Sequence, residues 1–147
     1  MATQLPRLTL SNGLQFPNIG YGTGGLTDAE ILKKSLAVMI ESGYRYIDTA
    51  QTYTNEHIIG EFLDETIKSG KLKRKDIFIT SKVECHVYCQ TYDLHEFCKK
   101  LGIVVTSYST LGNPGRPAHY KKEGDQDPLK HPYVLELAQK YKKDPAQ

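Results

Sequence analysis

The chain of 147 residues lacks the features that mark membrane, secreted and polyanion-binding proteins. No apolar run approaches the roughly 20 residues that a transmembrane helix needs, and the N-terminus lacks the pattern of a secretory signal peptide. Its three cysteines are an odd number, which favours a reduced, cytosolic setting over a disulfide framework. Its formal net charge is only +2, so composition indicates neither a nucleic acid nor another polyanion as partner.

What is present suits one domain with a single hydrophobic core, with no internal repeat and no low-complexity segment. An Asn12-Gly13 turn between short alternating runs at 8–10 and 14–16 predicts an N-terminal β-hairpin. Residues 18–22 predict a short strand that ends in a glycine-rich loop over 22–25. On this local signal alone, the loop is either a place where backbone approaches a ligand closely or a plain strand-to-helix connection.

Helices and strands alternate over the next part of the chain, which predicts an α/β fold with a parallel sheet. A capping box at 27–30 predicts the start of a helix, and Gly43 predicts its end. A buried strand is expected over 44–47, a second amphipathic helix up to Gly70, and a solvated turn over 71–76. A third strand is expected over 77–83.

After residue 83 the pattern changes, because no helix precedes the polar, strand-end-like residues 84–89. A short helix that ends at Gly102 and a β-branched strand over 103–108 follow. Residues 109–130 predict a loop rich in glycine and proline, and apolar residues at helical spacing over 134–141 predict a last helix.

Asp48, Tyr53 and Lys82 lie at or just past predicted strand ends, which is where α/β folds bind ligands. A free phenol has a pKa of about 10 and is a poor proton donor near neutrality. A neighbouring ammonium favours the phenolate, so a tyrosine beside a lysine is a better general acid. Spacing alone leaves two interpretations open: a site of this kind, or a structural ion pair beside a core tyrosine.

Several segments together resemble the aldo-keto reductase family. Gly43-Tyr44-Arg45, then Asp48-Thr49-Ala50, Tyr53, Asn55-Glu56 and Gly60 resemble its first signature, although Tyr46 stands where a small residue or histidine is usual. Residues 78–82 resemble the strand that carries the family's lysine, and residues 83–88 resemble its Val-Glu-Cys-His-x-Tyr segment. Residues 102–112 resemble its cofactor segment, with Thr110 where proline is usual.

The resemblance implies NADPH-dependent reduction of aldehydes or ketones to alcohols, with a small-molecule carbonyl substrate. It implies Tyr53 as proton donor, tuned by Asp48 and Lys82. It further implies that Tyr108 stacks on the nicotinamide, whose hydride goes to the carbonyl carbon. Gly22 and Thr23 would line the nicotinamide side and Ser109, Leu111 and Asn113 the pyrophosphate side. In such enzymes the cofactor supplies the chemistry while the protein orients and polarises.

By the same resemblance the fold is an incomplete (β/α)8 TIM barrel with an N-terminal hairpin and about five of its eight strands. A complete barrel needs roughly 200 residues or more. We expect one partial barrel domain over 1–147. The N-terminal barrel units lie in 1–83, and an internal deletion joins them directly to later units in 84–147. A C-terminal truncation removes the last units. The absent segments would carry the family's carbonyl-polarising histidine, which His86 does not replace.

Other interpretations follow from these absences. Five strands cannot close a barrel, so the open sheet edges predict self-association. The chain is then either a reductase of impaired activity, a non-enzymatic remnant that binds nucleotide weakly or self-associates, or a product without function. Metal binding by three cysteines and two histidines is not expected, because their spacing fits no standard zinc pattern: Cys85, His86, Cys89, His95 and Cys98.

Overall fold

The computed structural model describes residues 5–100, 105–113, 115 and 123–147. The chain forms two compact units, residues 1–82 and residues 83–147, and each is described by itself.

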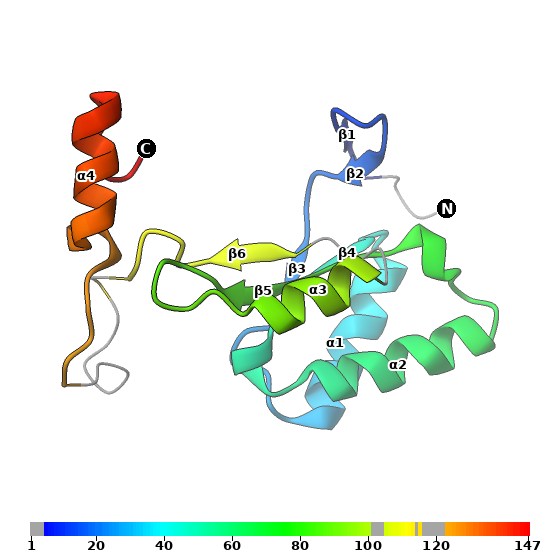
Figure 1. The fold of residues 1–147 in the computed structure, drawn as a ribbon. Helices are drawn as coiled ribbons and strands as arrows, with labels where there is room; N and C mark the ends of the chain where they lie inside the picture. Colours follow the sequence, from blue (N-terminus) through cyan, green and yellow to red (C-terminus); the bar gives the residue numbers. More distant parts are fainter. Residues whose placement is uncertain (1–4, 101–104, 114, 116–122) are drawn as a thin grey trace. The chain divides into compact units, whose positions relative to one another are not determined.

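The first unit begins with the predicted hairpin, which is confirmed (Figure 1). Strand β1 (Arg7–Thr9) pairs antiparallel with β2 (Gln15–Pro17). The turn depends on Gly13, whose φ of +83° is costly for other residues, and on the Asn12 side chain, which accepts a hydrogen bond from the Leu14 N–H.

Three parallel strands, β3 (Tyr21–Gly22), β4 (Tyr46–Ala50) and β5 (Phe78–Glu84), follow in that spatial order, and the last two residues of β5 belong to the second unit. Helix α1 (Ala29–Glu41) connects β3 to β4, and helix α2 (Glu56–Lys68) connects β4 to β5. Short 3-10 turns η1 (Gln51–Tyr53) and η2 (Arg74–Asp76) precede α2 and β5. The predicted α/β architecture is confirmed.

The core of the first unit lies between the two helices and the sheet, and its members are the apolar side chains of the predicted helical and strand patterns: Leu32, Leu36, Met39, Ile47, Ile58, Ile59, Leu63, Leu72 and Ile77. Leu72 corrects a prediction, since it lies in the segment 71–76 that the sequence presented as a solvated turn. Lys71 and Lys73, on either side of Leu72, are exposed, but the Leu72 side chain itself is buried.

Three predicted boundaries of α1 and β4 are wrong by one to three residues. Strand β4 ends at Ala50 rather than at Ile47, because its pairing with β5 continues to Ala50, so Asp48 lies inside the strand and not at its end. The cap of α1 is Asp28 rather than Thr27: the Asp28 carboxylate accepts the Ile31 N–H at 2.9 Å. Strand β4 starts at Tyr46 rather than Tyr44, because the Tyr44 N–H still bonds the Met39 carbonyl, where Gly43 (φ +88°) ends the helix as predicted.

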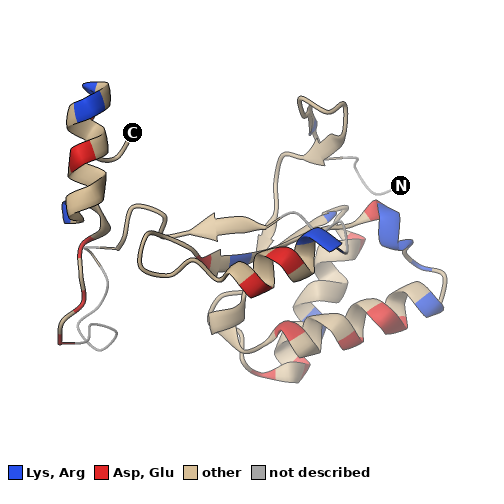
Figure 2. Cartoon of the chain, viewed as in Figure 1, with Lys and Arg blue, Asp and Glu red and all other residues tan. Residues whose placement is uncertain are grey.

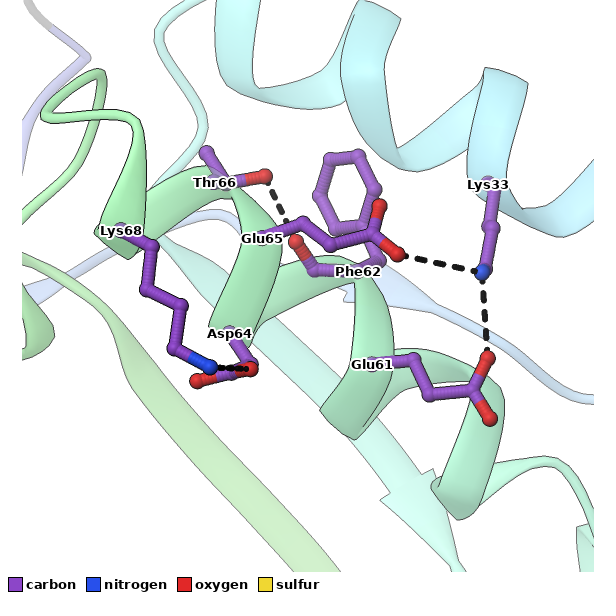
Figure 3. Close-up of polar contacts among 7 residues, drawn as sticks. All are labelled: Lys33, Glu61, Phe62, Asp64, Glu65, Thr66 and Lys68. Carbon is purple, nitrogen blue, oxygen red and sulfur yellow. Dashed lines mark hydrogen bonds and ion pairs between the residues drawn. The ribbon is translucent and has the colours of Figure 1, made fainter.

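Helices α1 and α2 lie side by side and are joined by ion pairs (Figures 1 and 3). Lys33 of α1 lies 3.0 Å from Glu61 and 3.8 Å from Glu65, and the hydrogen bond that Lys33 donates to Glu61 raises the pKa of Lys33. Figure 2 shows acidic residues along α2 and basic residues in the turn after it. The carboxylates of these pairs are exposed to solvent, so the pairs contribute little to stability.

The second unit contains the end of β5, α3 (Tyr92–Lys100), β6 (Thr106–Tyr108), a 3-10 turn η4 (Pro128–Lys130) and α4 (Pro132–Tyr141). β6 bonds the chain just after β5, with the Cys85 N–H donating to the Tyr108 carbonyl. The larger of the two sheets thus has four strands among the described residues, β3 to β6. Of residues 84–89, expected as a strand end, residue 84 ends β5 and the rest fold back through an isolated His86–Cys89 bridge.

The helices expected near 94–101 and 134–141 are present as α3 and α4. Residues 101–104 lie outside the described residues; they include Gly102 and the start of the strand expected at 103–108. Among the described residues of the second unit no large apolar side chain is buried. In the described part of the chain no helix is both long and apolar enough to cross a membrane.

Candidate active site

Asp48 and Lys82 lie on neighbouring parallel strands of the first unit. Asp48 is opposite Thr80, and Ala50 is opposite Lys82. Side chains two residues apart on a strand share a face, so Asp48, Ala50 and Lys82 all point to the same side of the sheet. The methyl group of Ala50 leaves room for the lysine to reach back toward Asp48.

The two side chains form an ion pair that carries a hydrogen bond from Lys82 Nζ to Asp48 Oδ1. Lys82 is only 18% exposed and Asp48 33%. Partial burial acts to lower the pKa of Lys82, but the hydrogen bond to Asp48 and the nearby Tyr53 outweigh it and raise that pKa above its ordinary value. Lys82 is therefore held as a cation.

Tyr53 ends the 3-10 turn η1 that follows β4, and it is half-buried. The left-handed conformation of Thr54 (φ +56°) ends this turn and starts the approach to α2. Lys82 Nζ lies 5.1 Å from the centroid of the Tyr53 ring. The structure thus brings Asp48, Tyr53 and Lys82 together, as the sequence predicted, and an ammonium lies beside the phenol.

The glycine-rich loop lies against this cluster. A methyl group at Gly24 would sit 3.3 Å from Tyr53 Cζ and 3.5 Å from its hydroxyl oxygen, so the absence of a side chain there lets Tyr53 approach the loop. Thr23 is buried, and both its N–H and its hydroxyl donate to the Asp48 carbonyl. Gly22 is exposed, with open space where a side chain would be.

The sequence predicted Asn55 and Glu56 as the start of a helix and as parts of the family signature, and α2 confirms the helix start. Their side-chain contacts were not predicted. The Asn55 amide donates to the backbone carbonyls of Thr23 and Leu26, both at 2.9 Å. Glu56 accepts a hydrogen bond at 2.6 Å from Ser81, the residue before Lys82. No spacing rule predicts hydrogen bonds between residues so far apart in the sequence. The sequence shows only that the residues are polar, and their burial is known only from the structure.

The remaining predicted cofactor residues belong to the second unit. Tyr108 ends β6 with half of its surface exposed, and Ser109 follows with a φ of +54°. Leu111 and Asn113 are exposed on the turn beyond it. Gly22, in the first unit, has open space where a side chain would be, and the ring of Tyr108, in the second unit, is half exposed. An exposed aromatic ring of this kind can stack on a flat ring such as nicotinamide.

The cysteines and histidines of the second unit make local contacts. His86 Nε2 lies 3.2 Å from Glu84, and the other ring nitrogen accepts the Tyr88 N–H. The thiols of Cys85 and Cys89 donate to nearby backbone carbonyls. Within the described ranges no group of three potential ligands is arranged to hold a metal ion.

The first unit is an α/β unit with a parallel sheet: an acid and a lysine lie on neighbouring strands, and a tyrosine lies in the turn that follows one of these strands. A family model described as "Aldo/keto reductase family" matches residues 18–93, just over half of the chain. The chain belongs to the aldo/keto reductase family.

Curated relatives include the "Aldose reductase" of Encephalitozoon cuniculi (strain GB-M1), which is 43% identical over 74 residues, covering 50% of this chain and 25% of that protein. The "NADH-dependent D-xylose reductase" of Candida parapsilosis is 39% identical, covering 56% of this chain and 25% of that protein. The "Aldo-keto reductase AKR2E4" of Bombyx mori is 35% identical, covering 70% and 36%.

A solved structure of an aldo-keto reductase (AKR2E5) complexed with NADPH matches with a TM-score of 0.50 and 21% identity, covering 97% of this chain and 74% of that one. This likeness supports the fold. The matches to the first of the curated relatives span about a quarter of those proteins' lengths.

Proposed function

We propose that this chain is an NADPH-dependent reductase of aldehydes or ketones, with Tyr53 as the proton donor. The observation that carries the proposal is the contact of one lysine with both other groups: Lys82 is ion-paired with Asp48 and lies over the Tyr53 ring. Together the three groups supply a proton donor and a neighbouring positive charge, which is what reduction of a carbonyl requires from a protein.

The proton step follows from this geometry. As the carbonyl carbon is reduced, its oxygen gains negative charge and needs a proton. Tyr53 donates the proton from its hydroxyl group, and the Lys82 ammonium stabilises the phenolate that remains. Asp48 keeps Lys82 charged and oriented, so its role acts through Lys82 rather than on the substrate.

NADPH supplies the hydride when it is bound. Gly22, Thr23 and Tyr108 would hold its nicotinamide end, and Ser109, Leu111 and Asn113 its pyrophosphate. Because the Thr23 side chain is buried and already bonded to Asp48, its contribution is to shape the loop. Relatives are named for NADH as well as NADPH, and the structural neighbour holds NADPH, so NADPH is our proposal for this chain.

The proposal includes impaired turnover. The family's carbonyl-polarising histidine belongs to a segment that this chain lacks, so Tyr53 alone would orient and protonate the oxygen.

Three free cysteines suit a reducing compartment, and we place the protein in the cytoplasm on that basis.

Titration of NADPH fluorescence and an aldehyde-reduction assay test the proposal together. Tyr53→Phe should keep cofactor binding and lose turnover, because the ring remains and only the donor hydroxyl is removed. Tyr44→Phe is the matched control, since Tyr44 is a half-buried tyrosine of the same unit that lies before β4. Failure to bind NADPH even at high concentration would reject the proposal.

A second candidate, self-association without catalysis, is favoured by one observation. Ile31 and Val38 lie seven residues apart on one face of α1 and are 58% and 61% exposed. The short β3 is also an edge of its sheet. Sedimentation velocity over a range of concentrations should show dimers that Val38→Glu abolishes. Lys71→Glu, a charge change at an exposed position in the turn after α2, serves as control.

A further inference from the structure

Asn55 occupies the N-cap position of α2 but does not cap the helix with its side chain. Asparagine is favoured at N-caps because its side-chain oxygen can accept a free N–H of the first turn. Here the amide is fully buried and turned away from the helix: its NH2 group donates to the Thr23 and Leu26 carbonyls, and its oxygen accepts from the Thr49 hydroxyl at 3.4 Å. The side chain therefore serves the glycine-rich loop and β4 rather than α2.

The loop that Asn55 holds contacts two members of the candidate site. Its Thr23 donates twice to the Asp48 carbonyl, and its Gly24 lies against the hydroxyl end of Tyr53. If the loop moved outward, the support on one side of Tyr53 would be lost. The Asn55 amide donates to one carbonyl before and one carbonyl after the pair Gly24-Gly25, so it holds the backbone on both sides of these glycines.

Glu56, the next residue, makes the corresponding contact on the other side. Its carboxylate accepts the Ser81 hydroxyl at 2.6 Å, and Ser81 directly precedes Lys82 on β5. A charge-assisted hydrogen bond of this length is strong and directional. It attaches the start of α2 to the strand that carries the lysine.

We infer that the dipeptide Asn55-Glu56 positions the side chains of Tyr53 and Lys82 next to each other. Asn55 holds the loop that supports Tyr53, and Glu56 holds the strand end that presents Lys82. Neither is a catalytic residue, because both act through other groups. The consequence for turnover rests on the proposed function, but the geometric claim does not.

The pH dependence of Lys82 reactivity tests this without cofactor or substrate. The full-length protein is labelled competitively with acetic anhydride between pH 8 and 11, and acetylation of the Lys82 peptide is read by mass spectrometry. Asp48 and Tyr53 are the groups that raise the pKa of Lys82. Misplacing them leaves more of the amine neutral, so Asn55→Ala and Ser81→Ala should each increase acetylation near pH 9 by about twofold or more.

Two variants control for a general loss of structure. Arg45→Met also removes donors to two backbone carbonyls of the first unit, those of Ile40 and Tyr44, but at the start of β4, so Lys82 should react as in the wild type. Glu56→Gln keeps an oxygen that accepts the Ser81 hydroxyl and should also behave as the wild type. In a Tyr53→Phe background, Asn55→Ala should add little further change.

The inference is overturned if folded Asn55→Ala and Ser81→Ala proteins give the wild-type Lys82 profile, or if Arg45→Met changes that profile equally. Near-UV circular dichroism establishes whether each variant is folded. If Asn55→Ala does not fold, Ser81→Ala decides: increased Lys82 reactivity supports the inference and unchanged reactivity overturns it. Because no step needs NADPH, this result is separate from success or failure of the proposed enzyme activity.

Discussion

At the scale of single residues, the molecule depends on one lysine between an acid and a phenol. The grouping of Asp48, Tyr53 and Lys82 could be predicted because strand ends of a parallel sheet share an edge. The register that puts Ala50 opposite Lys82, and so leaves room for the ion pair, could not, since register depends on both strands together. The buried amide of Asn55 could not be predicted either, because its partners are 29 and 32 residues away.

The Asp48–Lys82 pair should stabilise the protein in a pH-dependent way. The folded-state pKa of Lys82 is raised above its unfolded value, so its contribution is fully present below about pH 10.5 and is lost as pH rises through the folded-state pKa. Urea unfolding of the wild type and Lys82→Met at pH 8 and pH 11 measures this. We expect a smaller stability difference at pH 11; equal differences at both pH values would contradict the account.

Two glycines should respond to alanine in opposite directions. Gly60 lies inside α2 with open space around its Cα, so Gly60→Ala should stabilise the protein by about 0.5–1 kcal/mol. Gly43 has a φ of +88°, so Gly43→Ala should destabilise it by about 1 kcal/mol or more. Thermal or urea denaturation checks both, and a destabilising Gly60→Ala would show that this face of α2 is covered.

At the scale of elements, the order and kind of the helices and strands of the first unit could be predicted from periodicity. Their ends could not, because local competition decides them: Asp28 and Thr27 are both good caps, and only the structure shows which one bonds Ile31. Likewise, the Tyr44 N–H bonds the Met39 carbonyl and so belongs to the turn at the end of α1, although the sequence pattern fits a strand at Tyr44 equally well.

An aromatic cluster joins the N-terminal hairpin to the sheet. Phe16 of β2 lies 4.9 Å from Tyr46 and 5.2 Å from Phe78, between ring centroids. Tyr46, the residue that departs from the family pattern, covers Gly20, where an added methyl group would lie only 2.3 Å from the tyrosine ring. The unusual tyrosine therefore requires a glycine opposite it.

Gly20→Ala should destabilise the first unit by about 1–3 kcal/mol, because the methyl group would overlap the ring. In a Tyr46→Ala background the same change should cost little, since the ring is gone. Urea denaturation of the four proteins gives the coupling directly. Additive effects would mean that Tyr46 and Gly20 do not constrain each other.

At the scale of the whole molecule, stability is unevenly distributed. The buried apolar cluster lies entirely in residues 32–77, whereas among the described residues after 82 no large apolar side chain is buried. The family resemblance predicted an open, incomplete barrel, which this distribution suits. Pattern alone could not predict it, because residues 92–100 and 132–141 have the periodicity of packed helices and yet bury no residue in α3 or α4.

Amide hydrogen exchange should reflect this difference. Amides of α1, β4 and α2 should exchange more than about tenfold slower than those of α3 and α4, because exchange from unburied helices needs only local opening. Mass spectrometry of peptic fragments measures both regions in one experiment. Equal protection of α4 and α2 would show that the second unit gains a partner in solution.

The central claim, that Tyr53 donates a proton during carbonyl reduction, is tested most directly by isotope transfer. The wild type is incubated with para-nitrobenzaldehyde and NADPH carrying deuterium at the hydride-donating carbon, and the alcohol is analysed by mass spectrometry. We expect deuterated alcohol from the wild type, and at least about a hundredfold less from Tyr53→Phe, which is the usual loss when a general acid is removed. Equal amounts of deuterated alcohol from the two proteins, or none above background from the wild type, would contradict the account.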